Sequence, residues 1–196
     1  MGVTAGGRGR VHSRVVMKAH GVSALAVVTV VVGLGAAPLG FAQTEPAVPL
    51  EGRYAPASAA TNAEAIERAI ERTAEPFFFA IRGIVRSRLR DANPVFPFVE
   101  IRTQGEVIEC NTPPVLARDA DDGRASSVMG LDQNRNNLTH HRVGNTLAQT
   151  TWNADGTRHT RFVPTGASGL TVHVEVSSPR LSVPLRYVMH YRRVGP

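Results

Sequence analysis

The alternation of apolar and polar residues in the C-terminal two-thirds of the chain constrains the fold most strongly. In Leu170–Val176, apolar residues at every second position alternate with Thr171, His173 and Glu175, and Leu185–Arg192 has a similar pattern. Successive side chains of a strand point to opposite faces of its sheet, so a period of two predicts two half-buried strands. An amphipathic helix would need a period near 3.6, which neither segment has.

Turn signals divide the rest of this region at hairpin spacing. They are Gln104-Gly105, Asp119–Gly123, Gly144-Asn145, Asn153–Gly156 and Thr165–Gly169. No helical pattern separates them, so neighbouring strands are expected to pair antiparallel through short turns. Residues 95–194 are therefore predicted to form an eight- to nine-stranded antiparallel meander, closed as a barrel or bent as a strongly curved sheet.

One or two helices are expected before the meander, in residues 61–92. Thr61 and Glu64 have the spacing of a capping box, which marks a helix start. Pro76 interrupts the pattern, either as a kink or as the first-turn proline of a second helix, and Asn93-Pro94 ends it. The predicted class is α+β, with residues 61–196 as a single domain.

The second helical segment has an apolar face beside a row of arginines. The apolar residues are Phe77, Phe78, Ile81, Ile84, Val85 and Leu89, and the basic row is Arg82, Arg86 and Arg90. Such a face can pack against the sheet, or it can lie on an anionic membrane or a partner protein. Both alternatives stay open from sequence alone.

The N-terminal 42 residues have the pattern of a secretory signal peptide. Val22–Ala37 is an uncharged apolar run preceded by basic residues, and small residues favour cleavage between Ala42 and Gln43. A retained membrane anchor is the alternative. Met17 resembles the natural start of such a leader, which makes residues 1–16 a candidate over-extension of the reading frame. Export to the periplasm or the cell exterior is predicted, with residues 43–60, rich in Pro and Ala, as a flexible lead-in.

The charge balance argues against nucleic acid as a partner. Four of the 22 basic residues precede Ala42 and none of the 16 acidic residues does, so the remaining chain is close to neutral. Nucleic acid binding needs a dense cationic surface, which is not expected here. The lone Cys110 excludes an internal disulfide and is predicted to be a buried thiol.

The order and spacing of the strands between Val95 and Val194, in an exported chain of this size, resemble the lipocalin-type up-and-down β-barrels. The G-x-W signature of that family is absent, and Gly52-Arg53-Tyr54 only approximates it. No ligand-binding residues can therefore be carried over. The resemblance implies only a cavity for a small apolar molecule.

The histidines do not form a metal-binding pattern. His159, His173, Glu175 and Arg186 are expected on one outward-facing patch, where Arg186 and the neighbouring Arg161 would repel a cation. His140 and His141 are adjacent and must face opposite sides of their strand. The inward one is either a buried core residue or a polar contact inside a ligand cavity.

The sequence shows no recognisable catalytic pattern, metal site or cofactor motif. The leading hypothesis is an exported, non-catalytic protein that binds a small apolar or amphiphilic ligand within the curved sheet. The predicted wall residues are Trp152, Phe162, Tyr187, Met189 and Tyr191, for which a solid core is the alternative. The rival hypothesis is an envelope-associated structural or interaction domain, which contacts a membrane or partner through Arg82, Arg86 and Arg90.

Overall fold

The computed structural model describes residues 49–131 and 133–195. Their elements are β1 (Gly52–Pro56), α1 (Ala59–Ala74), α2 (Phe79–Ala92), β2 (Val99–Gln104), β3 (Val107–Thr112), β4 (Val115–Ala120), β5 (Ser126–Met129), β6 (Arg135–Val143), β7 (Thr146–Asn153), β8 (Gly156–Thr165), β9 (Gly169–Ser177) and β10 (Leu185–Gly195). The expected signal peptide lies outside the described residues. Neither described helix is long and apolar enough to cross a membrane.

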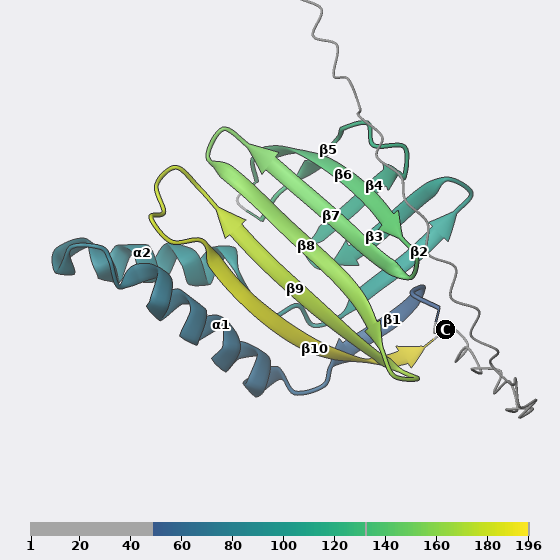
Figure 1. Ribbon diagram of the computed structural model, residues 1–196, viewed down its shortest axis with the longest axis horizontal. Helices are drawn as coiled ribbons and strands as arrows, with labels where there is room; N and C mark the ends of the chain where they lie inside the picture. The colour runs from purple at the N-terminus through teal and green to yellow at the C-terminus, as the bar shows by residue number, and fades with distance from the viewer. Residues whose placement is uncertain (1–48, 132, 196) are drawn as a thin grey trace, which may run out of the picture. The chain divides into compact units, whose positions relative to one another are not determined.

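All ten strands belong to one antiparallel sheet, in the order β4-β3-β2-β1-β10-β9-β8-β7-β6-β5. The sheet curls so that β7–β10 form one wall, with β2–β4 behind it and the helices at one end (Figure 1). The predicted α+β class and curved antiparallel meander are confirmed, because β2–β10 supply nine strands joined by short turns. Glycines with positive φ occupy four of the predicted turns: Gly105, Gly123, Gly144 and Gly166.

The wall is closed between β4 and β6 by side chains. No backbone ladder joins β4 to β5 within the described residues, so both strands end the sheet order. The carboxylate of Asp119 accepts the backbone N–H of His140 at 3.3 Å, and that of Asp121 accepts the N–H of Arg142 at 3.0 Å. These bonds satisfy backbone donors that would otherwise be exposed along an open edge.

The expectation of a flexible lead-in over residues 43–60 is wrong for its described part. Gly52–Pro56 forms β1, a strand between β2 and β10. Leu50 is 1 % exposed and Tyr54 is fully buried, with the Tyr54 hydroxyl donating to the Leu50 carbonyl at 2.9 Å. Five residues are too few to show a convincing period of two, and the flanking Pro and Ala residues suggested a linker.

The first helix begins earlier than the capping-box pattern indicated. Ser58 is the N-cap, and its side chain accepts the backbone N–H of Thr61 at 3.2 Å. Thr61 therefore lies inside the first turn and does not cap the helix. Ile66 and Ile70, which lie one turn apart on this helix, are buried.

Helix α1 covers an edge of β10 that no strand covers. Because β1 is short, it pairs with β10 only from Tyr191 onward. The Asn62 side chain accepts the His190 N–H at 2.9 Å and donates to the His190 carbonyl at 3.0 Å. Further along the same edge, Arg72 donates to the Arg186 carbonyl. The helix thus supplies hydrogen bonds that a neighbouring strand would make.

Helix α2 packs little of its apolar face against the core: none of its residues is buried, and Leu89, near its end, is the partly buried apolar residue that contacts the core. Its arginine row faces α1 instead: Arg90 pairs with Glu67 at 2.8 Å, and Arg86 pairs with Glu71. Arg82 donates to the Glu75 carbonyl at 2.8 Å. The predicted membrane or partner surface of Arg82, Arg86 and Arg90 is therefore engaged within the molecule.

As a result, four large apolar side chains near the start of α2 are exposed: Phe78, Phe79, Ile81 and Ile84. We refer to them as the α2 apolar cluster. The most exposed of them, Phe79, has 75 % of its surface accessible. The ion pairs between α1 and α2 explain this arrangement, because they orient the opposite side of the helix toward the rest of the protein.

Candidate functional site

A cavity of about 500 Å³ lies within the curved sheet, next to the last turn of α2. This volume is in the range of small-molecule binding sites in proteins. Apolar residues from several strands and the segment after α2 line one part of it: Phe96, Val115, Val128, Leu131, Phe162 and Val176. These side chains offer a surface for the hydrocarbon part of a ligand.

The remaining wall is polar and comes mainly from β6, β7 and β8. Its uncharged polar residues include Thr112, Asn136, Gln149, Thr151, Asn153 and Thr160. The Asn153 amide donates to Asn136 Oδ1 at 2.7 Å, which holds two of them together. A cavity lined by both apolar and polar side chains suits an amphiphilic ligand better than a plain hydrocarbon.

Four charged residues line this cavity, Arg88, Asp91, Asp155 and Arg158. Of these, Arg158 on β8 is half-buried and held by side-chain hydrogen bonds. Its guanidinium donates to the Tyr187 hydroxyl and to Asn93 Oδ1, both at 2.9 Å. The Tyr187 hydroxyl also donates to Asn93 Oδ1 at 3.1 Å. Among the described residues Arg158 has no carboxylate partner, whereas Asp155 nearby pairs with Arg180 at 2.9 Å. A half-buried, fixed and unneutralised guanidinium can bind an anionic group.

His140 is the inward member of the His140–His141 pair. It is fully buried, while His141 is exposed, so they face opposite sides as expected. The Gln149 amide and Asp119 lie beside the ring, although neither ring nitrogen forms a well-directed hydrogen bond with them. Burial lowers the pKa of His140, although the nearby Asp119 and Gln149 side chains act in the opposite direction. An unpaired polar group in the interior costs about 1–3 kcal/mol, so this ring needs an explanation.

The five predicted wall residues have three different environments. Phe162 lines the cavity. Trp152 alternates along β7 with Thr151 and Asn153, which line the cavity, so it lies on the opposite face and is not a wall residue. The other three predicted residues, Tyr187, Met189 and Tyr191, are buried but do not line the cavity.

Two of these buried residues have structural roles at the cavity's edge. The Tyr187 hydroxyl holds Arg158, as described above. The Tyr191 hydroxyl donates to the carbonyl of Phe96 at 3.4 Å, and burial raises its pKa well above the ordinary range. Tyr191 therefore stays neutral and stabilises the backbone before β2.

Sequence reasoning missed the polar lining residues, with Arg158 the most important. On β7 and β8, polar residues occupy both faces, so the alternation that identified β9 and β10 does not separate inside from outside. The informative signal was this lack of an apolar face in two consecutive strands. A half-buried sheet normally has one apolar face, and its absence indicates a polar interior.

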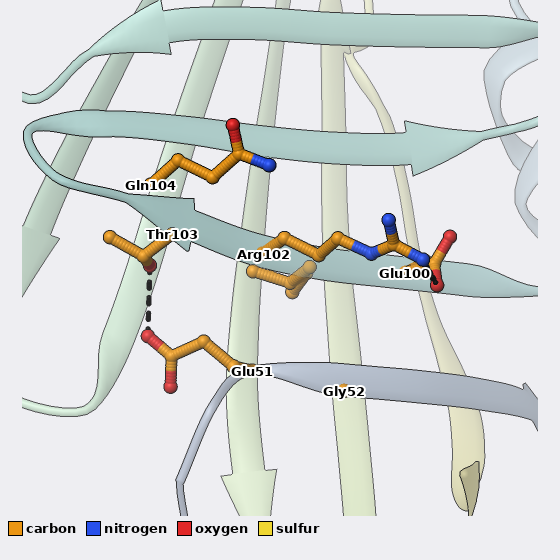
Figure 2. Close-up of a pocket in the computed structure, with 7 residues that line it drawn as sticks. Glu51, Gly52, Glu100, Arg102, Thr103 and Gln104 are labelled. Atoms are coloured by element: carbon orange, nitrogen blue, oxygen red, sulfur yellow. Dashed lines mark hydrogen bonds and ion pairs between the residues drawn. The ribbon is translucent and has the colours of Figure 1, made fainter. Parts of the chain in front are cut away.

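A second hollow, of about 310 Å³, lies at the surface near the start of β1. Its polar groups already bind one another: Glu51 accepts from Thr103 at 2.9 Å, and Arg102 pairs with Glu100 at 2.6 Å (Figure 2). Although burial opposes it, hydrogen bonds from Arg142 and Thr103 hold the pKa of Glu51 below its ordinary value. Because these polar groups already bind one another, the hollow offers few free hydrogen-bonding groups to a ligand.

The outward patch of His159, His173, Glu175 and Arg186 is confirmed as a cross-strand arrangement. Glu175 lies opposite both His159 and Arg186, and it accepts from Arg186 Nε at 2.8 Å. His173 lies opposite Arg161. Ion pairing and hydrogen bonding on the outer face account for these residues.

Cys110 is fully buried as predicted, and burial raises the pKa of its thiol to about 12. It remains protonated and does not act as a nucleophile at neutral pH.

No protein family model matches the sequence, and no curated protein matches it. Similar solved structures include a fatty acid transporter described as REP1-NXSQ, with 17 % identity, 75 % of this chain and 97 % of that chain covered, and a TM-score of 0.47. Fatty-acid-binding protein 1 of Echinococcus granulosus shares 12 % identity over 74 % of this chain and 97 % of its own, with a TM-score of 0.46.

Zebrafish ileal bile acid-binding protein, solved with cholic acid, shares 14 % identity over 74 % of this chain and 98 % of its own, with a TM-score of 0.45. At these identities and TM-scores the likeness carries no argument about function. The antiparallel strand order of the described residues itself shows the barrel-like up-and-down fold, whereas the narrower lipocalin label is not confirmed. Among the described residues, the tenth strand, β1, which precedes the two helices, is the element that the strand spacing did not reveal.

Proposed function

We propose that this protein is a non-catalytic binding protein that holds a small anionic amphiphile in the cavity of its barrel. The apolar part of the ligand lies against Phe96, Phe162 and Val176, and its acidic group binds Arg158. The observation that carries the proposal is the guanidinium of Arg158, which borders the cavity without a carboxylate partner among the described residues.

The surroundings of Arg158 support an anion and disfavour a cation. Tyr187 and Asn93 hold the guanidinium from one side through oxygen acceptors, which leaves its net charge in place. Charge-assisted hydrogen bonds to a carboxylate contribute about 1.5–3 kcal/mol each. This energy adds to the burial of the hydrocarbon part, which contributes about 0.8 kcal/mol per buried methylene.

The proposal is tested with dodecanoate and its cationic analogue dodecyltrimethylammonium, in titration calorimetry. Wild-type protein is expected to bind dodecanoate, and Arg158→Gln is expected to weaken this binding about tenfold or more. Thr151→Trp, which places an indole in the cavity, should abolish binding. The cationic analogue should bind weakly to wild-type protein, because Arg158 repels it.

Arg161→Gln is the matched control, because Arg161 lies on the same strand but on the exposed outer face. It should leave the affinity for dodecanoate unchanged, and thermal unfolding of each variant verifies folding. Equal binding of both amphiphiles, or unchanged binding in Thr151→Trp, would show that the cavity is not the binding site.

A second candidate function is attachment to a membrane through the α2 apolar cluster. Four neighbouring exposed apolar side chains are unusual on a soluble surface and are typical of interaction sites. Because Arg82, Arg86 and Arg90 bind α1 and the turn before α2, this attachment would depend on apolar insertion more than on the arginine row.

Co-sedimentation with phosphatidylcholine vesicles, with and without anionic lipid, tests this second function. Wild-type protein is expected to sediment with both, and Phe78→Ser combined with Phe79→Ser should reduce the bound fraction severalfold. Leu116→Ser is the control, because Leu116 is an exposed apolar residue on β4. Failure of the wild-type protein to sediment with either vesicle would eliminate membrane attachment.

A further inference from the structure

We infer that the cavity prefers amphiphiles whose acidic group carries two negative charges, as a phosphate monoester does, because Arg88 and Arg158 bind that group together. The inference rests on the proposed function, in which Arg158 binds the acidic group, and it narrows the ligand class. Arg88 belongs to α2 and lines the same cavity as Arg158.

Arg88 points in a different direction from the arginines of α2 that bind α1. Successive residues of an α-helix are rotated by about 100°, so Arg88 lies about 160° around the helix from Arg86 and Arg90. Those two arginines pair with glutamates of α1. Arg88 and Ala92 are one turn apart on the other side of the helix, and both line the cavity. The ion pairs between the helices therefore direct Arg88 toward the cavity.

The charge of Arg88 is available to a ligand. Helix α2 contains four arginines, and three of them, Arg82, Arg86 and Arg90, bind a carbonyl or a carboxylate. Arg88 is exposed and has no hydrogen-bond or ion-pair partner within residues 49–131 and 133–195. An arginine that lines a cavity and has no partner can bind an anionic group there.

Arg158 brings its guanidinium to the same end of α2. Its Nη1 lies 3.5 Å from the carbonyl oxygen of Ala92 and 2.9 Å from Asn93 Oδ1. Arg88 precedes Ala92 by one turn, which is about 6 Å along the helix axis. The two cations therefore border one end of the cavity, where a single acidic group can contact both.

The carboxylates that line the cavity do not neutralise these two arginines. Asp155 pairs with Arg180 at 2.9 Å. Asp91 interacts electrostatically with Arg90, its neighbour in the sequence, and forms no ion pair with Arg88 or Arg158.

A monocarboxylate can neutralise only one of the two guanidinium groups. A phosphate monoester carries about −1.5 to −2 charges at pH 7 and presents three acceptor oxygens, so it can bind both. Because guanidinium groups bind phosphate through paired hydrogen bonds, the geometry of the head group also suits them.

Titration calorimetry tests this inference with dodecyl phosphate, dodecyl methyl phosphate, dodecanoate and inorganic phosphate. Wild-type protein is expected to bind dodecyl phosphate about fivefold tighter than dodecanoate, a gain that suits an ion pair with an exposed arginine. Dodecyl methyl phosphate keeps the phosphorus centre but carries one charge, so it should bind like dodecanoate. Inorganic phosphate should bind far more weakly than dodecyl phosphate, because it lacks the hydrocarbon chain.

Arg88→Gln should remove the preference for dodecyl phosphate and leave the affinity for dodecanoate within about twofold. Arg88→Lys keeps the positive charge and should retain part of the preference. Arg68→Gln is the matched control, because Arg68 is exposed in a surface pair with Glu64 on α1, and it should keep the full preference. Thermal unfolding verifies folding, and the Tm of Arg88→Gln should stay close to that of the wild type, since this side chain is exposed.

The possible results separate this inference from the proposed function. Binding of dodecanoate without a preference for dodecyl phosphate, or a preference that persists in Arg88→Gln, would overturn the role of Arg88 and leave the cavity function intact. Equal affinities for dodecyl phosphate and its methyl ester would overturn the requirement for a second charge. Inorganic phosphate that binds as tightly as dodecyl phosphate would show a site for free phosphate and overturn the inference. Binding of no amphiphile to wild-type protein would overturn both proposals.

Discussion

Replacing Leu50 by alanine is expected to lower the free energy of unfolding by about 3 kcal/mol. Leu50 is 1 % exposed and belongs to the hydrophobic core, although it precedes the first strand. Its carbonyl also accepts the Tyr54 hydroxyl, so the segment is held at two points. The shortened side chain would leave a cavity that this fixed backbone cannot refill. Urea denaturation followed by circular dichroism measures the change.

Leu116→Ala is the matched control for this prediction. Leu116 is 51 % exposed on β4, so its truncation should change stability by less than about 1 kcal/mol. A flexible lead-in would make both substitutions equally mild. A loss below about 1 kcal/mol for Leu50→Ala would therefore contradict the burial of this segment and restore the interpretation suggested by its composition.

Replacing Asn62 by alanine is expected to cost about 2–3 kcal/mol of stability. The Asn62 side chain is buried and forms two hydrogen bonds with the backbone of His190. The His190 carbonyl would keep a second donor, the N–H of Ala57, at 2.9 Å. Its N–H would lose the acceptor supplied by Asn62, on the edge of β10 that α1 covers. The same denaturation experiment measures the effect.

Glu64→Ala is the corresponding control, because Glu64 lies on the exposed side of α1 in a surface pair with Arg68. It should change stability by less than about 0.5 kcal/mol. If Asn62→Ala were equally mild, the hydrogen bonds from Asn62 could not be what attaches α1 to β10. In that case the backbone amide of His190 would remain protected from hydrogen exchange in Asn62→Ala.

Most of the strand architecture was predictable because it depends on local pattern. On β9 and β10 one face is apolar and the other mostly polar, so the period of two was visible in the residues themselves. The turns were predictable for a similar reason, since glycine is the residue that tolerates positive φ. β1 was missed because its burial comes from its neighbours β2 and β10, which are remote in sequence.

The candidate site was less predictable than the fold. Phe162 was expected at the cavity and lines it, but Arg158 was not expected there. Strands with polar residues on both faces do not reveal which face is inside. Only the register that connects β8 to its neighbours places Arg158 near Tyr187 and Asn93.

The arginine row of α2 illustrates the same limit. An amphipathic helix indicates that one face is buried, but it does not indicate what the charged face contacts. Here Glu67 and Glu71 of α1 bind Arg90 and Arg86, and these ion pairs leave the α2 apolar cluster exposed. The sequence contains both charge rows, yet their alignment depends on how the two helices meet.

By itself, the sequence determined the elements that depend on neighbouring residues: an eight- to nine-stranded meander, its turns, and one or two helices before it. Only the tertiary structure decided that β1 joins the sheet, that α1 covers β10, and that polar residues of β6–β8 line a cavity. The physical reason is the separation along the chain over which each interaction acts. Secondary structure follows from residue spacing within a few positions, whereas burial and charge pairing depend on segments that are distant along the chain.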